Sequence, residues 1–304
     1  MESPIRFFKI KQEFAEKEGS FLSEIRRDDI CFFRFVGGNT SETDKLGRQL
    51  NRLKASGALL IGIFRFPFRF EGKRRMQTAI EQYYRMREIC DAVTYLNSDG
   101  MMETLKPGTP IHQAREIFDR FEEASVRSIE ETIRVSGEMN IDAHDIRSFM
   151  KNSSGPVYIR TFEGDSFDEP LKYAISAPYL PQDFTEGRQM IVNIGYTQNV
   201  DMLSFQQINL RLNDLFNKAE LVKLGSYFIN EPGHRFRITL FIHGMQDPFP
   251  RPEQMGKSYL RRLWLKRKWD ELAIRSRHFR WSPLERRDRT DSPETVGEKR
   301  ELQA

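Results

Sequence analysis

The sequence predicts an α/β protein built from parallel β-α-β units, and three observations indicate this fold class. Short apolar runs of strand length alternate with longer segments whose apolar residues recur at helical spacing. Residues 58–66 form a nearly continuous apolar run, which is typical of a strand buried on both faces of a parallel sheet. The 304 residues include 24 Phe and 9 Tyr, so the chain holds enough large apolar side chains to build a core.

The first half of the chain predicts strands and helices in alternation. Residues 1–29 are polar and helix-prone, and we expect an N-terminal helical segment there. The strands that we expect next are residues 30–36, 58–66 and 91–96. The helices that we expect after these strands are residues 48–53, 71–90 and 111–135. Because a helix joins each strand to the next, the strands are predicted to run parallel.

The second half of the chain predicts a smaller mixed sheet. Ser153, Ser154, Gly155 and Pro156 are typical of a linker. The strands that we expect beyond it are residues 157–162, 188–196, 221–229 and 235–243. The helices that we expect are residues 169–177 and 203–216, which would cover this sheet. Three prolines, Pro248, Pro250 and Pro252, are predicted to end the folded body.

The net charge of +4 is unevenly distributed along the chain. Residues 257–281, from Lys257 to Trp281, contain nine Lys and Arg against two acidic residues, and they hold all three Trp. The first 256 residues carry a net charge of about −2, so charge alone does not make the body a nucleic-acid-binding surface. Basic residues interleaved with Trp suit binding to an anionic membrane surface and, as a less favoured ligand, to RNA. The alternative is a helix that packs its aromatic residues on the body. Residues 282–304 are charged and contain Pro283 and Pro293, and we expect disorder there.

From the sequence we expect several classes of site and signal to be absent. We find no apolar run of membrane-spanning length and no secretory signal in the first 20 residues. Cys31 and Cys90 lie in apolar segments without metal-ligand spacing, as expected of core residues in a reducing cytoplasm. The five His form no ligand pair, so we expect no metal site.

Residues 66–76 read FPFRFEGKRRM, and residues 139–146 read MNIDAHDI. These two motifs resemble signatures of FtsZ, the bacterial relative of tubulin. Residues 66–76, FPFRFEGKRRM, are similar to its strand-to-helix pattern KPFxFEGKxRM. Residues 139–146, MNIDAHDI, are similar to its pattern MNxDxxDv, and they follow the expected long helix. Residues 188–196 and 235–244 resemble strands of its C-terminal domain. The resemblance covers about residues 30–244, roughly two thirds of the chain.

The resemblance implies a truncated Rossmann-like GTPase-type domain of the FtsZ/tubulin kind, followed by an α+β domain of the FtsZ C-terminal type. FtsZ begins with a glycine-rich turn and further phosphate loops, whereas only about thirty residues precede the first predicted strand here. The segments that we expect are the N-terminal helical segment 1–29, the partial GTPase-type domain 30–152, the C-terminal-type domain 153–247, the Pro linker and basic segment 248–281, and a disordered tail 282–304.

The nucleotide side of the family's site is altered in this sequence. The loop GGGTGTG of the family is similar to residues 37–44, of which only Gly37 and Gly38 keep glycine and in which Glu42 and Asp44 would repel phosphates. The remnants of a guanine-nucleotide pocket implied by the resemblance are Gly37, Gly38, Thr40 and Asp99, although a Gly-Gly pair such as Gly37-Gly38 is more often a plain strand-to-loop turn. We therefore expect no firmly bound cofactor, with GTP or GDP as the alternative.

The opposite side of the family's site is retained. In the family, one subunit supplies GTP and the next inserts an NxDxxD loop that polarises the attacking water, a role that the resemblance transfers to Asn140, Asp142 and Asp145, acting in trans. The same residues also suit a helix cap, and both roles can hold together.

We therefore predict a degenerate FtsZ-like protein that joins FtsZ or another FtsZ-like subunit through this loop and modulates or caps polymerisation in cell division. The predicted location is the cytoplasm, at the division site or the inner membrane face. One alternative is a diverged GTP-binding GTPase that a partner chain completes. Another is a non-cytoskeletal adaptor that binds membrane or RNA through residues 257–281.

Overall fold

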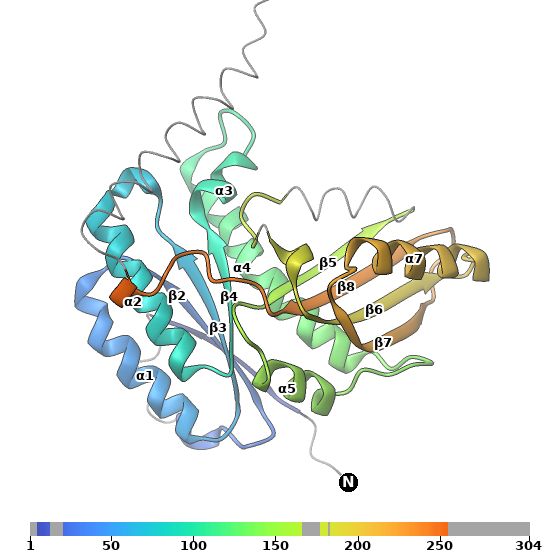
Figure 1. Ribbon diagram of the computed structural model, residues 1–304, viewed down its shortest axis with the longest axis horizontal. Helices are drawn as coiled ribbons and strands as arrows, with labels where there is room; N and C mark the ends of the chain where they lie inside the picture. The colour runs from blue at the N-terminus through green and yellow to red at the C-terminus, as the bar shows by residue number, and fades with distance from the viewer. Residues whose placement is uncertain (1–4, 13–20, 166–176, 182, 255–304) are drawn as a thin grey trace, which may run out of the picture. The chain divides into compact units, whose positions relative to one another are not determined.

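Four parallel strands form the first sheet of the computed structural model, which describes residues 5–12, 21–165, 177–181 and 183–254 (Figure 1). The strands are β1 (Phe7–Lys11), β2 (Ile30–Val36), β3 (Leu59–Phe66) and β4 (Ala92–Asn97), and they lie side by side in that order. All three pairings are parallel. The apolar runs that predicted β2, β3 and β4 are almost wholly buried, which confirms the expected α/β class.

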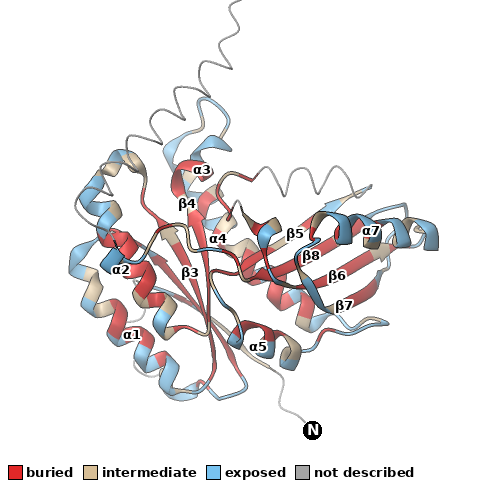
Figure 2. Ribbon diagram, in the orientation of Figure 1, coloured by how far each residue is buried: buried red, intermediate tan, exposed pale blue. Residues whose placement is uncertain are grey.

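Helices cover both faces of this sheet. The helices of this half are α1 (Thr43–Ala55), α2 (Lys73–Ile89), α3 (Ser98–Glu103) and α4 (Ile111–Arg134). The aromatic ring of Tyr83 on α2 packs against Phe64 and Phe66 of β3 on one face. On the other face, Phe32 and Ile61 share a core cluster with Val126 and Ile129 of α4. Figure 2 shows the strands buried between helices whose outer faces are exposed.

The second sheet is mixed and has the strand order β5-β8-β6-β7. Its strands are β5 (Tyr158–Gly164), β6 (Gln189–Thr197), β7 (Glu220–Ile229) and β8 (Phe236–His243). β8 runs antiparallel to both of its neighbours, and β6 runs parallel to β7. Helix α7 (Met202–Leu215) covers one face, and α5 (Ala143–Lys151) precedes the sheet in the chain. The short 3-10 helices are Phe21–Glu24, Thr40–Glu42, Arg69–Glu71, Phe184–Glu186 and Pro252–Gln254.

The expectation of helix in residues 1–29 is wrong for Phe7–Lys11, which form strand β1. The unpaired edge of β2 offers a full ladder of backbone hydrogen bonds, and this outweighs a local helix preference. Ile10 is buried against the sheet, and the ammonium group of Lys9 lies 2.8 Å from Glu123 and 3.1 Å from Glu130 on α4. Lys9 therefore forms ion pairs with α4 beside the core.

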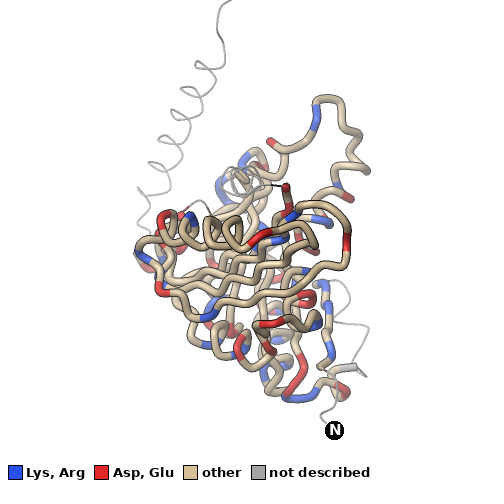
Figure 3. The backbone as a smooth tube through the Cα atoms, turned by 90° about the vertical axis from the view of Figure 1, so that its right-hand side faces the viewer, with Lys and Arg blue, Asp and Glu red and all other residues tan. Residues whose placement is uncertain are grey.

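Three further expectations depend on segments outside the described residues. The helix expected at residues 169–177 falls almost entirely on such residues, as do the basic segment 257–281 and the tail 282–304. The described residues all belong to the compact unit Met1–Met255. In that unit, Lys, Arg, Asp and Glu occur together along the helices and loops, as Figure 3 shows. Cys31 and Cys90 are buried and unbonded, as expected of core residues.

Candidate functional site

Residues 137–145, which we name the carboxylate loop, connect α4 to α5 and lie against edge strand β7. The backbone N–H of Ser226 donates to the carbonyl of Met139 at 2.9 Å, and Met139 returns a longer bond of 3.4 Å. The Ile141 side chain is buried beside Gly225, where a Cβ would come within 2.6 Å of it. The sheet and a buried anchor thus hold the loop in one conformation.

The three predicted catalytic residues form local hydrogen bonds within this loop. Asp142 is the N-cap of α5, and its Oδ1 accepts from the N–H of Asp145 at 2.8 Å. Asp145 Oδ2 accepts in return from the N–H of Asp142 at 3.0 Å, which completes a capping box. Asn140 Oδ1 accepts from the N–H of Gly137 at 2.6 Å. The capping role is therefore present, while Asn140 and Asp142 remain exposed to solvent.

Lys223 of β7 neutralises one of the two carboxylates. Its ammonium group donates to Asp145 Oδ2, the same oxygen that accepts from Asp142. Partial burial acts to raise the pKa of Asp145, but the hydrogen bonds from Lys223 and Asp142 outweigh burial and lower this pKa below its ordinary value. Asp145 is thus a fixed, paired carboxylate, and Asp142 is the exposed carboxylate of the loop.

The glycine turn, residues 37–44, lies at the carboxyl end of β2 and is tied internally. A Cβ at Gly37 would overlap the ring of Phe64, and Gly38 has a φ of +108° that favours glycine. The N–H of Gly38 donates to Oε1 of the fully buried Gln82 at 2.8 Å. Nε2 of Gln82 donates to the Asn39 carbonyl at 2.7 Å and to Thr43 Oγ1 at 2.9 Å. Packing and a buried amide therefore account for both glycines.

Three further side chains of the glycine turn lie close to polar groups of the protein. Glu42 lies 3.5 Å from Lys45, and Asp44 lies 3.7 Å from Arg85. Thr40 Oγ1 is 3.4 Å from Thr78 Oγ1. The glycine turn thus carries two carboxylates, each with a cation beside it.

Asp99, which the resemblance implied as a remnant of the guanine-nucleotide pocket, anchors a neighbouring segment. It is 8% exposed, and it accepts from Arg69 Nε at 2.8 Å and from the Arg69 N–H at 3.2 Å. The hydroxyl of Ser98 donates to the carbonyl of Phe66 at 2.5 Å. The Asp99 bonds hold the 3-10 helix Arg69–Glu71, where the FEGKRRM motif begins, against the start of α3, and the Ser98 bond ties α3 to the end of β3.

The two halves of the predicted site lie at opposite ends of the first sheet. The glycine turn and Asp99 follow the carboxyl ends of β2 and β4. Helix α5, which follows the carboxylate loop, reaches the amino ends instead, where Arg147 donates to the carbonyl of Asp29 at 3.3 Å. Ser153, just beyond α5, donates to the carbonyl of Asp91 at 3.3 Å. One chain therefore does not bring the two halves together, and the assigned roles stay predictions.

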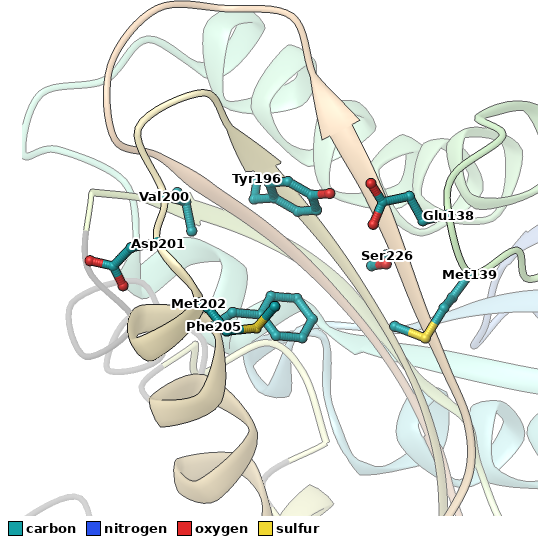
Figure 4. A pocket seen from close by; sticks show the side chains of 8 residues that line it. All are labelled: Glu138, Met139, Tyr196, Val200, Asp201, Met202, Phe205 and Ser226. Carbon is teal, nitrogen blue, oxygen red and sulfur yellow. The ribbon is translucent and has the colours of Figure 1, made fainter.

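A pocket of about 210 Å³ lies beside the carboxylate loop, and sequence reasoning missed it (Figure 4). Its lining residues are Glu138, Met139, Tyr196, Val200, Asp201, Met202, Phe205 and Ser226. They come from the loop, from β6 and β7, and from the start of α7, so sequence spacing does not group them. Partial burial and a hydrogen bond with Glu138 raise the pKa of the Tyr196 hydroxyl.

Within the residues that the structure describes, there is neither a cluster of metal ligands nor a helix that could span a membrane. Among them we find no group of three or more His, Cys, Asp or Glu arranged to hold a metal ion. Their helices also include none with the length and apolar character that a bilayer crossing requires.

Comparisons with curated proteins relate the chain to FtsZ. It is 28% identical over 255 residues to cell division protein FtsZ 1 of Thermococcus kodakarensis, covering 83% of this chain and 68% of that protein. It is 25% identical over 244 residues to cell division protein FtsZ of Methanothermobacter thermautotrophicus, covering 79% and 64%. The chain thus spans about two thirds of the length of these relatives. No family model matches it.

Solved structures share the fold. An empty FtsZ dimer of M. jannaschii superposes with a TM-score of 0.62 at 22% identity, over 77% of this chain and 69% of that one. CetZ of Methanosaeta thermophila gives a TM-score of 0.57 at 16% identity, over 88% and 73%. A TubZ two-stranded filament gives 0.61 at 12% identity, over 90% and 73%.

Proposed function

Because the chain belongs to the FtsZ/tubulin superfamily, we propose that it associates with FtsZ-type filaments through its carboxylate loop and modulates or caps their polymerisation in cell division. In this role the loop contacts the nucleotide exposed on the terminal subunit of a filament. The chain then offers the next subunit no nucleotide of its own, so growth stops or slows at that end. The site of action is the cytoplasm, at the place of division.

The observation that carries this proposal is the hydrogen bond from the Gly38 N–H to Gln82. A glycine-rich turn binds phosphate through backbone N–H groups that have no other partner. Here the Gly38 N–H already donates to the buried side chain of Gln82, and Glu42 and Asp44 add negative charge to the same turn. The carboxylate loop, in contrast, keeps Asn140 and Asp142 exposed. This asymmetry favours a chain that binds another subunit's nucleotide over one that holds its own.

Co-sedimentation of the full chain with purified FtsZ and GTP tests the proposal. Asp142→Asn removes the exposed charge and keeps a good N-cap, because Asn caps helices about as well as Asp. We expect the fraction of this variant that pellets with the filaments to be much smaller than the fraction of the unmodified chain. Asp44→Asn, which changes an exposed carboxylate of the glycine turn, is the matched control and should pellet like the unmodified chain. Equal pelleting of all three chains would contradict the proposal.

Calorimetry of the full chain with GTP separates this role from the alternative of a diverged GTPase. Capping by the loop requires no affinity of the chain for free GTP. A binding isotherm with low-micromolar affinity would instead favour a GTPase that a partner chain completes.

A further inference from the structure

Strand β1 lies at an outer edge of the first sheet. The strand order is β1-β2-β3-β4, so β1 pairs with a strand of this sheet on one side only. Among the residues that the structure describes, no hydrogen bond outside the β1–β2 ladder reaches the backbone of Phe7, Lys9 or Lys11. An edge of this kind presents a row of backbone donors and acceptors to which a further strand can bind.

The first and last bonds of the ladder show which residues of β1 face outward. The carbonyl of Arg6 accepts from the first N–H of β2 at 3.0 Å, and the N–H of Gln12 donates to a carbonyl of β2 at 3.2 Å. Because alternate residues of a strand bond to the same neighbour, the even-numbered residues of β1 face β2. The residues whose N–H and carbonyl groups point away from the sheet are therefore Phe7, Lys9 and Lys11.

The two lysines of this edge are already paired with acidic residues. Charged residues on an edge strand, Lys above all, normally oppose the addition of another strand. Here the Lys9 ammonium group lies 2.8 Å from Glu123 and 3.1 Å from Glu130, both on α4. The Lys11 ammonium group lies 3.8 Å from Asp119 of the same helix. The positive charge of the edge is thus balanced, which weakens its usual protection against pairing.

We propose that β1 pairs with β1 of a second copy of this chain, antiparallel and with Lys9 opposite Lys9 of the other copy. In this register Phe7 lies opposite Lys11, so outward-facing residues meet only outward-facing residues. Every outward N–H and carbonyl group of both strands then gains a partner, as a ladder of antiparallel strands requires. The first sheets of the two copies become one continuous sheet, and the contact requires no nucleotide.

The side chains also match in this register. Phe7 lies on the α4 face of the sheet, with the Arg134 guanidinium 4.9 Å from its ring centre, and it meets the long side chain of Lys11. Phe8 lies opposite Ile10 on the other face, and aromatic and β-branched residues form stabilising cross-strand pairs. The strand is therefore complementary to itself, which favours a second copy as the occupant. A two-fold contact of this kind closes after two copies.

Cysteine cross-linking of the full chain tests the contact and its register. Opposite residues of a hydrogen-bonded antiparallel pair have Cα atoms about 5.5 Å apart, within the range of a disulfide. Lys9→Cys should therefore form a cross-linked dimer under mild oxidation. Lys11→Cys is the matched control, because the two copies of this residue would lie at least about 13 Å apart, too far for a disulfide. The native cysteines, Cys31 and Cys90, are buried and should not compete.

Sedimentation velocity of the full chain without nucleotide gives the second measurement. The mass of the unmodified chain should rise with concentration to that of a dimer and no further. Lys9→Pro removes an outward N–H and places a ring in the path of the second strand, but it leaves the bonds to β2 in place. It should weaken association by at least about tenfold. Lys9→Ala loses the same ion pairs and keeps the N–H, so this control should still dimerise.

Three results would overturn the proposal. One is a chain that stays monomeric at all concentrations, and another is equal cross-linking of Lys9→Cys and Lys11→Cys. The third is a Lys9→Pro chain that associates as strongly as the unmodified chain, since another surface would then be the interface. The contact does not depend on the proposed function, because its variants leave Asn140, Asp142 and Asp145 unchanged. Pelleting of Lys9→Pro with FtsZ filaments therefore separates failure here from failure of the capping role.

Discussion

Gln82 illustrates how one buried side chain changes what a glycine turn can do. Its amide bonds three groups of the turn, namely the Gly38 N–H, the Asn39 carbonyl and the Thr43 hydroxyl. Each of these bonds lies within 3 Å, and Gln82 itself is fully buried. The side chain of Gln82 thus holds the turn by bonds of the kind that a bound anion would otherwise make with its N–H groups.

Replacing Gln82 tests this structural role. Gln82→Met keeps the length of the side chain but takes this partner from the Gly38 N–H, the Asn39 carbonyl and the Thr43 hydroxyl. We expect the free energy of unfolding of the full chain to fall by about 2–4 kcal/mol, measured by urea denaturation. Gln77→Met, on the exposed face of the same helix, should change it by less than about 0.5 kcal/mol. Equal stability of the two variants would show that the amide does not hold the turn.

Asp145 predicts a pH dependence whose sign follows from its lowered pKa. Because the pKa is lower in the folded protein than the ordinary value of 3.8, this carboxylate stabilises the fold above pH 3.8. The stabilisation is lost as pH falls below 3.8 through the lowered pKa. Unfolding free energies measured from about pH 2 to about pH 6 should therefore fall less steeply with acid in Asp145→Asn than in the unmodified chain. Lys223→Met should reproduce part of this flattening, and an unchanged acid slope in both would contradict the pairing.

At the scale of elements, the sequence and the structure agree where burial is uniform. The apolar runs of β2, β3 and β4 are buried on both faces and were predicted within a few residues. Strand β1 was not, because its FFKIK pattern combines large apolar residues with two lysines. What makes it a strand is the free edge of β2 and the acidic residues of α4, both of which are distant in sequence. Non-local pairing of this kind leaves no local signal.

The same limit applies to the candidate site. The positions of Asp142 and Asp145 predicted a helix cap, and the resemblance to FtsZ implied a water-polarising pair; the structure shows the cap. The pairing of Asp145 with Lys223 and of Gly38 with Gln82 joins residues tens of positions apart. A motif match names such residues, but only the fold shows which of their donors and acceptors are already occupied.

Strand β1 should contribute measurably to stability through its one buried side chain. Ile10 is 4% exposed and faces the core beside Phe33, so Ile10→Ala should lower the unfolding free energy by about 2–4 kcal/mol. Lys11→Ala removes an exposed ion pair of 3.8 Å to Asp119 and should cost less than about 1 kcal/mol. Thermal and urea unfolding of the full chain provide the comparison. A small effect of Ile10→Ala would mean that β1 is dispensable for the first sheet.

At the scale of the whole molecule, the glycine turn lies at the carboxyl ends of the first sheet, and α5, which follows the carboxylate loop, reaches the amino ends. A subunit that keeps both ends functional extends a filament, whereas one that keeps a single end terminates it. A terminating chain acts on filament ends, so far fewer copies than FtsZ subunits are needed.

This asymmetry makes a prediction about potency. Because a terminating chain acts on filament ends, the unmodified chain should inhibit FtsZ polymerisation at a small fraction of the FtsZ concentration. Asp142→Asn, which changes the exposed carboxylate of the loop, should not inhibit at that ratio. Light scattering at a fixed FtsZ concentration, over a series of chain concentrations, measures the difference. Inhibition that needs equal amounts of the chain and of FtsZ would contradict action at filament ends.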